Sequence, residues 1–210
     1  MEKIESVIAE KLLQINAIKL NPTNPYTWAS GWKSPIYCDN RKILSFPKVR
    51  GLVKNEFVNL LKQVYKNVDV IAGVATGAIA HGALVADLLD LPFIYIRSAS
   101  KSHGLENLIE GILEEGQNVV VIEDLISTGG SSIKAVEAIR ERKANVLGML
   151  AIFTYGFNQA EQNFEKADCQ LNTLSNYHAL IQKALESGYI TKEQLGMLAD
   201  WRKNPEIWMQ

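Results

Sequence analysis

An acidic pair followed by a turn of small residues is the part of this sequence best suited to chemistry. Four apolar residues at 119–122 lead into Glu123 and Asp124, and positions 127–132 hold Ser, Thr and Gly. This order predicts a buried strand, a tight turn and a helix N-terminus, where backbone N–H groups and the helix dipole attract a phosphate group. The carboxylates suit ribose hydroxyls or a ligand that carries Mg²⁺. We therefore expect a sugar phosphate at the carboxyl end of a parallel sheet.

The elements that must position this site follow from the spacing of apolar residues. Short runs that are apolar throughout alternate with stretches of helical periodicity, which is typical of an α/β fold with a central parallel sheet flanked by helices. The predicted strands are 68–74, 92–96, 119–122 and 146–153. The predicted helices follow apolar spacing over 4–18, begin at Pro47, and cover 78–89 and 131–142. Residues 21–40 are expected to form loops and short strands, and the chain after Lys166 is expected to be mostly helical, with a capping box at 191–194.

Composition narrows the class of protein. The 210 residues suffice for one substantial domain, and 47% of them are hydrophobic. Lys and Arg number 22 against 23 Asp and Glu, which gives a net charge of −1 and no support for a nucleic-acid or membrane partner. Cys38 and Cys169 are too few and too far apart for a disulfide framework or a zinc site. We expect a cytoplasmic protein, because no segment has the pattern of a signal peptide or a membrane span.

The segment from Glu123 to Ser131 resembles the phosphoribosyl-pyrophosphate motif of type I phosphoribosyltransferases and, among these, of orotate phosphoribosyltransferases. The resemblance implies one domain over 1–210, with an N-terminal helix and hood (1–45), a core (46–166) and a helical tail (167–210). It implies transfer of ribose 5-phosphate from phosphoribosyl pyrophosphate to orotate, with Mg²⁺ held mainly through phosphoribosyl pyrophosphate and no direct metal ligand from the protein. The alternatives are a phosphoribosyltransferase for a purine base, a non-catalytic regulator that senses phosphoribosyl pyrophosphate, and an ordinary strand–turn–helix junction.

A basic segment follows the predicted strand 92–96. Arg97, Lys101 and His103 place three potential cations within seven residues, which suits a ligand with several phosphate charges, although a solvated basic loop has the same composition. The segment is similar to the catalytic loop of orotate phosphoribosyltransferases, which closes over the pyrophosphate in the neighbouring subunit's site. The resemblance therefore implies a homodimer with a shared active site. Ser98 stands where many members of the family carry a second Lys.

Two further segments match the family's pattern. Ser30-Gly31-Trp32-Lys33-Ser34-Pro35 is similar to the hood over the base, and Gly73-Val74-Ala75-Thr76-Gly77 is similar to the pyrophosphate loop. Ala29 and Thr76 stand where family members often have Lys, and 151–155 lacks the Arg that some members use for the orotate carboxylate. Within the wider segment from Tyr26 to Tyr37, the aromatic residues Trp28, Trp32 and Tyr37 have an alternative role as core or dimer contacts.

The resemblance assigns site residues position by position. The catalytic residues are Arg97, Lys101, His103 and Asp124. Phosphoribosyl pyrophosphate is expected to contact Arg97, Lys101, His103, Thr76, Gly77, Glu123, Asp124, Leu125, Ile126, Ser127, Thr128, Gly129, Gly130 and Ser131. Orotate is expected to contact Ser127, Ile36 and Tyr37.

Overall fold

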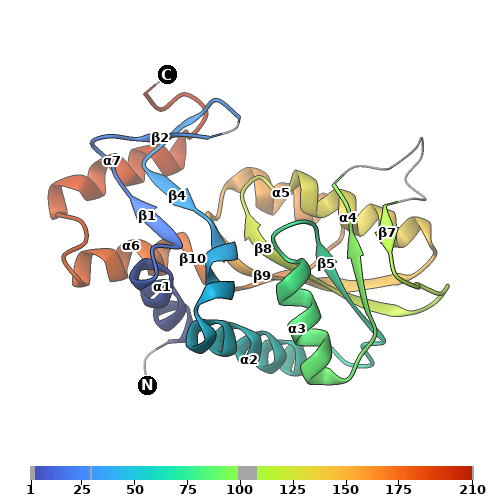
Figure 1. The fold of residues 1–210 in the computed structure, drawn as a ribbon. Coiled ribbons are helices and arrows are strands. Elements are labelled where there is room, and N and C mark those ends of the chain that lie inside the picture. Colours follow the sequence, from blue (N-terminus) through green and yellow to red (C-terminus); the bar gives the residue numbers. More distant parts are fainter. Residues whose placement is uncertain (1–2, 29, 99–107, 210) are drawn as a thin grey trace.

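A six-stranded sheet runs through the middle of the structure (Figure 1). The computed structural model describes residues 3–28, 30–98 and 108–209. The strand order is β10 (Leu171–Asn176), β9 (Asn145–Thr154), β8 (Asn118–Ile126), β5 (Val70–Val74), β6 (Phe93–Ile96) and β7 (Ile109–Glu110). The first five strands are parallel and β7 is antiparallel to β6, which confirms the predicted α/β fold with a mostly parallel sheet.

Helices cover both faces of this sheet. One face packs against α1 (Ile4–Gln14), α2 (Pro47–Val64), α3 (Ile79–Leu89) and α6 (Tyr177–Glu186), and the other against α4 (Gly130–Glu141) and α5 (Asn158–Lys166). Successive residues of β8 serve the two faces in turn, since Val120 and Ile122 join the first core while Val119 and Val121 join the second. This double burial explains why the strands are apolar throughout rather than alternating.

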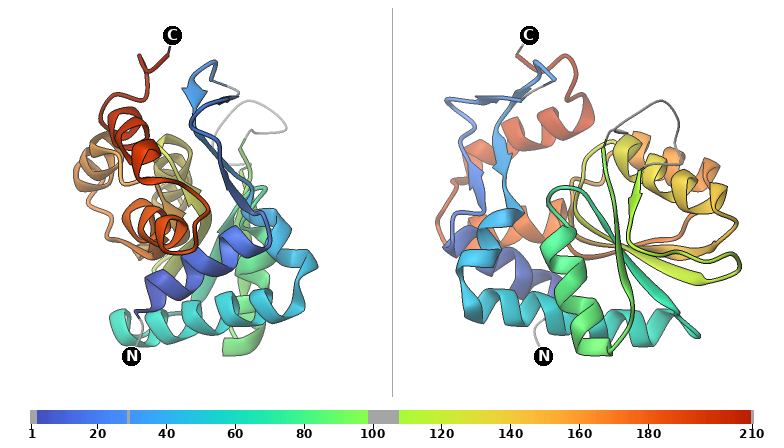
Figure 2. Two further views of the ribbon diagram at one scale, coloured as in Figure 1. Left: turned by 90° about the vertical axis from the view of Figure 1, so that its left-hand side faces the viewer. Right: turned by 45° about the vertical axis from the view of Figure 1, so that its right-hand side comes forward.

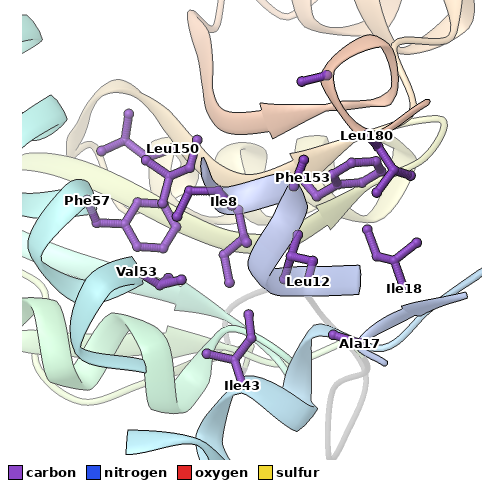
Figure 3. Packing of buried hydrophobic residues seen from close by; sticks show 14 of the residues in the cluster. Ile8, Leu12, Ala17, Ile18, Ile43, Val53, Phe57, Leu150, Phe153 and Leu180 are labelled. Atoms are coloured by element: carbon purple, nitrogen blue, oxygen red, sulfur yellow. The ribbon is translucent and has the colours of Figure 1, made fainter. Parts of the chain in front are cut away.

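The larger core lies between the sheet and the N-terminal helices. Figure 3 shows Ile8 and Leu12 of α1 close to Phe57 of α2 and Phe153 of β9, and all four are fully buried. Pro47 begins α2 as predicted, because a proline at the first helical position loses no hydrogen bond there. These contacts hold the strands whose carboxyl ends carry the predicted site.

Small strands form the hood beside the sheet. β1 (Ile18–Leu20) pairs with β4 (Ile36–Cys38), β2 (Tyr26–Thr27) pairs with β3 (Lys33–Ser34), and the 3₁₀-helix η1 (Asn40–Ser45) follows β4. The tail helix α7 (Lys192–Lys203) lies beside the hood in Figure 2, with the Trp201 ring 5.7 Å from that of Trp28. The hood and the tail therefore support each other.

Three elements illustrate where the structure differs from the sequence-based expectation. α1 ends at Gln14, and Asn16 turns the chain with a φ of 54°, so that Ile18 begins a strand instead of continuing the helix. β8 does not end at the acidic pair but continues to Ile126, because Leu125 pairs with Phe153 of β9. The tail contains β10, an edge strand of the sheet, which was not predicted because many of its residues are polar.

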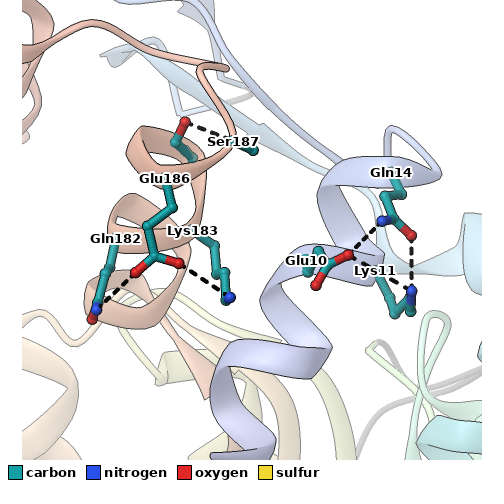
Figure 4. A network of polar contacts seen from close by, with 8 residues as sticks. Glu10, Lys11, Gln14, Gln182, Lys183, Glu186 and Ser187 are labelled. Carbon is teal, nitrogen blue, oxygen red and sulfur yellow. Dashed lines mark hydrogen bonds and ion pairs between the residues drawn. The ribbon is translucent and has the colours of Figure 1, made fainter. Parts of the chain in front are cut away.

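Polar side chains cover the outer surfaces of the helices. On α1, Lys11 Nζ donates to Gln14 Oε1 at 3.0 Å, and on α6 the Lys183 and Glu186 side chains form an ion pair at 3.1 Å (Figure 4). Such pairs within one helix stabilise it by about 0.2–0.5 kcal/mol each, so packing of the apolar faces dominates. In the described part of the chain, no helix is long and apolar enough to cross a membrane.

Candidate active site

Three of the predicted segments meet at the carboxyl ends of the parallel strands. In the parallel register Gly73 of β5 lies beside Ile122 of β8, and Val74 lies beside Ile96 of β6. Three adjacent strands therefore end side by side, with the acidic pair near the end of β8, the turn 75–77 after β5 and Arg97 after β6. With strands about 4.8 Å apart, the three segments span roughly 10 Å across the edge. This is the place where ligands bind in parallel α/β sheets.

The two acidic residues point to opposite faces of β8. Glu123 is 5% exposed and lies under α4, where its carboxylate accepts hydrogen bonds from the Ser132 hydroxyl and from the Asp124 N–H, each at 2.9 Å. Burial raises the pKa of the Glu123 carboxyl well above its usual value, and the charge of Asp124 adds to the effect. Glu123 thus braces the start of α4 in this structure, and Asp124 is the more exposed acid.

Asp124 lies between the turn 75–77 and the hood. A side chain at Gly77 would collide with the Asp124 carboxylate in its present position, so glycine allows this close approach. The Asn40 amide Nδ2 donates to the Asp124 carbonyl oxygen at 2.6 Å, which ties η1 to β8 across 84 residues of sequence. The peptide bond between Ala75 and Thr76 is cis, and Thr76 is exposed.

The turn between β8 and α4 presents open backbone donors. Gly129 has a φ of 81° and precedes the first residue of α4. Within the described residues, the backbone N–H groups of 128–132 have no acceptor. The turn is braced from α5, because Asn163 Nδ2 donates to the Thr128 carbonyl oxygen at 2.8 Å. A braced turn with free N–H groups at a helix N-terminus is suited to bind a phosphate.

Arg97 stands at the base of the predicted catalytic loop. Its N–H donates to the Leu108 carbonyl oxygen at 2.8 Å, so the loop begins and ends on the paired strands β6 and β7 at one border of the sheet. Its guanidinium Nη1 lies 3.5 Å from Glu110 Oε1. A cleft of about 320 Å³ is lined by Ala75, Thr76, Ile79, Tyr95, Arg97, Ser98 and Glu110. Lys101 and His103 lie outside the described residues, as does Ala29.

The hood residues divide into buried and exposed groups. Ile36 is fully buried in the core, so its side chain has no exposed surface for a ligand, whereas Tyr37 is 38% exposed. Trp28 has a structural role, because its Nε1–H donates to the Ile36 carbonyl oxygen at 3.0 Å and its ring lies 5.2 Å from that of Tyr155. Of the hood residues predicted to contact orotate, Tyr37 alone presents its side chain at the surface.

Two buried polar residues beside Asp124 were not predicted from the sequence. Asn40 and His81 are each at most 2% exposed, and Asn40 Oδ1 and His81 Nε2 have no partner in the described part of the chain. Burial lowers the pKa of His81, although the charge of Asp124 acts in the opposite direction. No short motif marks these residues, because they reach Asp124 only through the tertiary fold.

A larger cleft lies beyond the carboxyl end of β9, since Gly156 and Phe157 are among its lining residues. It has a volume of about 590 Å³ and is lined by residues of α5, α6 and α7 together with Trp32. None of the described residues predicted for the site lines it. In the same described part, no group of three or more His, Cys, Asp or Glu side chains is placed to hold a metal ion.

Comparison with known proteins identifies the family. Residues 43–187 match the family described as "Phosphoribosyl transferase domain". The chain is 59% identical over 208 residues to "Orotate phosphoribosyltransferase" of Porphyromonas gingivalis, with 99% of both chains covered. It is 55% identical over 205 residues to the protein of that name from Listeria innocua, with 98% of both covered. The chain belongs to the orotate phosphoribosyltransferase family.

Solved structures agree with the expected fold. The crystal structure of orotate phosphoribosyltransferase from Aeropyrum pernix superposes with a TM-score of 0.75 at 24% identity, over 88% of this chain and 99% of that one. The structure of Leishmania donovani UMP synthase gives a TM-score of 0.79 at 26% identity and covers 94% of this chain but 42% of that one. The expected type I phosphoribosyltransferase fold is therefore confirmed.

Proposed function

We propose that this chain transfers ribose 5-phosphate from phosphoribosyl pyrophosphate to orotate, giving orotidine 5′-monophosphate and pyrophosphate in the synthesis of UMP. The observation that carries this proposal is the turn after Asp124, where the N–H groups of 128–132 have no acceptor among the residues that the structure describes, in a chain that aligns over almost its whole length with orotate phosphoribosyltransferases. The names of these relatives favour orotate over a purine base and an enzyme over a regulator.

The turn between β8 and α4 would hold the 5′-phosphate. Its N–H groups and the dipole of α4 stabilise negative charge at a fixed point. The phosphate then acts as a handle that orients the ribose C1 atom toward the base. Asp124 would accept hydrogen bonds from the ribose hydroxyls and place negative charge near the cationic sugar that forms as the bond to pyrophosphate breaks. The role of Glu123 in this proposal is to support Asp124 and α4 from the opposite face of β8.

The leaving pyrophosphate would be bound at the cleft beside the turn 75–77. Thr76 and Gly77 offer backbone groups there, and Arg97 offers a guanidinium. Lys101 and His103 of the loop would add charge to the same group as it leaves, and a closed loop would strengthen these contacts by excluding water. The orotate nitrogen attacks as an anion, so the reaction needs no strong general base.

The donor set fits Mg²⁺ held mainly through its ligand. Asp124 is the more exposed of the two carboxylates at the end of β8 and is assigned to the ribose, so Mg²⁺ would be held mainly by oxygens of phosphoribosyl pyrophosphate, the hard ligands that it prefers. When bound, the ion would neutralise charge on the pyrophosphate. Asp124 would orient the ribose by accepting hydrogen bonds from its hydroxyls.

The choice of base is tested by turnover. The protein, phosphoribosyl pyrophosphate and Mg²⁺ are incubated separately with orotate, uracil, adenine, guanine and hypoxanthine, and pyrophosphate release is followed. We expect release with orotate and little with the other bases. Release with a purine and none with orotate would contradict the proposal.

The proposed active unit is a homodimer with shared sites. Support comes from the resemblance of the segment around Lys101 and His103 to a loop that acts in the neighbouring subunit's site, and the described residues that flank it follow β6 and precede β7 at the border of the sheet. Cyclic dimers are also the commonest soluble assemblies. The expected contributions of the two subunits are separable, because Asp124 would come from one subunit and Lys101 from the other.

Subunit mixing tests the shared site. Lys101→Ala and Asp124→Asn should each lose most of the activity. Mixed dimers should recover part of it, because one site then combines an intact acidic residue with an intact loop. If exchange of subunits is verified and no activity returns, each loop serves its own subunit.

The remaining proposals concern organisation and compartment. Residues 1–210 would act as one domain, since Trp201 of the tail packs against Trp28 of the hood and Tyr155 at the end of β9. We propose a cytoplasmic location, which the free thiols of Cys38 and Cys169 support because they suit a reducing compartment.

A further inference from the structure

The carboxylate of orotate needs a cation at the base end of the site. A carboxylate that is removed from water without a charged partner is strongly destabilised, because it loses its hydration without compensation. Ala29 precedes the hood segment, and residues 151–155 contain no basic side chain. The acid at this end, Asp124, would repel a second carboxylate. A cation from another part of the chain is therefore expected beside the carboxylate of orotate.

Arg41 is held next to Asp124 by its neighbours in η1. Asn40, the preceding residue, is hydrogen bonded to the Asp124 carbonyl oxygen at 2.6 Å. On the other side of Asn40, Asp39 accepts a hydrogen bond from Arg41 Nε, also at 2.6 Å. The Arg41 side chain is 61% exposed and that of Asp39 is 16% exposed, so the carboxylate is the fixed partner. One edge of the guanidinium is thus anchored.

The rest of the guanidinium is available. In the part of the chain that the structure describes, Nη1 and Nη2 of Arg41 have no hydrogen-bond partner. The hydrogen bond to Asp39 raises the pKa of Arg41, and Tyr37 and Asp124 lie near enough to add to this shift. Arg41 thus directly follows Asn40, the residue bonded to the Asp124 carbonyl oxygen, and it lies four residues after Tyr37, which is predicted to contact the base.

The other basic side chains near the carboxyl ends of the strands contact other groups or lie farther from β8. Arg97 follows β6, two strands away from β8, and lies beside Glu110. Lys33 donates to Thr27 Oγ1 at 2.9 Å, and Lys42 donates to the Asn16 carbonyl oxygen at 3.1 Å. Among the described residues, Arg41 combines closeness to Asp124 with free donor groups.

We propose that Arg41 binds the carboxylate of orotate through its terminal nitrogens, while Asp39 orients the guanidinium. The assignment rests on the proposed function and adds a specificity-determining residue to it. Arginine suits this role, because its planar fork matches the two oxygens of a carboxylate. The ring of the base would then lie toward Tyr37, and C1 of the ribose toward Asp124.

Two nucleotides that differ by this carboxylate provide the test. Orotidine 5′-monophosphate carries it and UMP does not, so the ratio of their dissociation constants isolates the contact from binding of the phosphate and ribose. Calorimetric titration is done on the wild-type protein, Arg41→Gln, Arg41→Lys and the control Lys48→Gln, which removes an exposed charge from the neighbouring α2.

Arg41→Gln should weaken binding of orotidine 5′-monophosphate about 10- to 100-fold and leave that of UMP nearly unchanged. Arg41→Lys should restore part of the difference, and Lys48→Gln should behave as wild type. In kinetics, the KM for orotate should rise in Arg41→Gln while that for phosphoribosyl pyrophosphate stays close to wild type.

Two results would overturn the assignment. An unchanged ratio in Arg41→Gln would show that the carboxylate is bound elsewhere, and equal weakening of both nucleotides would show that Arg41 acts on the phosphate or on the fold. Failure of the proposed function is separate, because it would appear in the wild-type protein as no turnover of orotate. That result would overturn both claims.

Discussion

The turn between β8 and α4 differs from the aromatic cluster around Trp201 in how far its residues are exposed to solvent. In the turn, the N–H groups of 128–132 lack acceptors within the described residues, and Gly130 and Ser131 are exposed. In the cluster, Trp201 is fully buried, with the rings of Tyr155 and Phe157 at 5.7 and 5.5 Å. The comparison indicates that the turn keeps polar groups ready for a ligand, whereas the cluster supplies stability and joins the tail to the hood.

The largest effect on stability is expected from Trp201→Ala. Removing a fully buried indole should lower the free energy of unfolding by about 3–5 kcal/mol, measured by urea denaturation. Tyr189→Ala, at a 41% exposed aromatic residue, serves as the control and should change it by less than about 1 kcal/mol. Binding of ribose 5-phosphate to the folded fraction should remain. Similar losses in both variants would remove the distinction between the cluster and the surface.

Asp124→Asn should lose activity rather than stability, in contrast to Trp201→Ala. The variant should fold with a stability close to wild type, but turnover should fall about 10- to 100-fold, because hydrogen bonds to the carboxylate weaken. Asp200→Asn on the exposed side of α7 is the matched control. Near-normal turnover in Asp124→Asn would leave this acid with a structural role only.

A smaller effect is expected from the pH dependence of stability at Glu123. Because its pKa is raised in the folded protein, the folded state holds this proton more tightly than the unfolded state, and stability falls as the pH rises above the ordinary value near 4.5. Glu123→Gln removes this contribution. The free energy of unfolding of the variant, relative to wild type, should therefore improve between pH 4.5 and 8. A constant difference across this range would show that the carboxyl is not perturbed.

Much of the fold and of the site could be predicted from the sequence, because both depend on local patterns. The apolar run before Glu123 and the small residues at 127–132 indicated the β8–α4 turn correctly. The opposite orientations of Glu123 and Asp124 were missed, because β8 continues to Ile126 through pairing with β9. The strand β10 was missed because polar residues interrupt it at the edge of the sheet.

Contacts between distant segments could not be predicted. Asn40 reaches the backbone of Asp124 across 84 residues, and His81 is buried close to the same acid. Neither has a characteristic neighbour in sequence. Arg41 likewise acquires its proposed role from the position of η1 beside β8.

The binding of a phosphate by the backbone of 128–132 is tested most directly by the amide resonances of these residues. Titration of ¹⁵N-labelled protein with ribose 5-phosphate should shift the amides of 128–132 in a saturable manner, and ribose without phosphate should leave them nearly unchanged. Shifts confined to the larger cleft around Phe157 and Arg202, or equal shifts with ribose, would contradict the account.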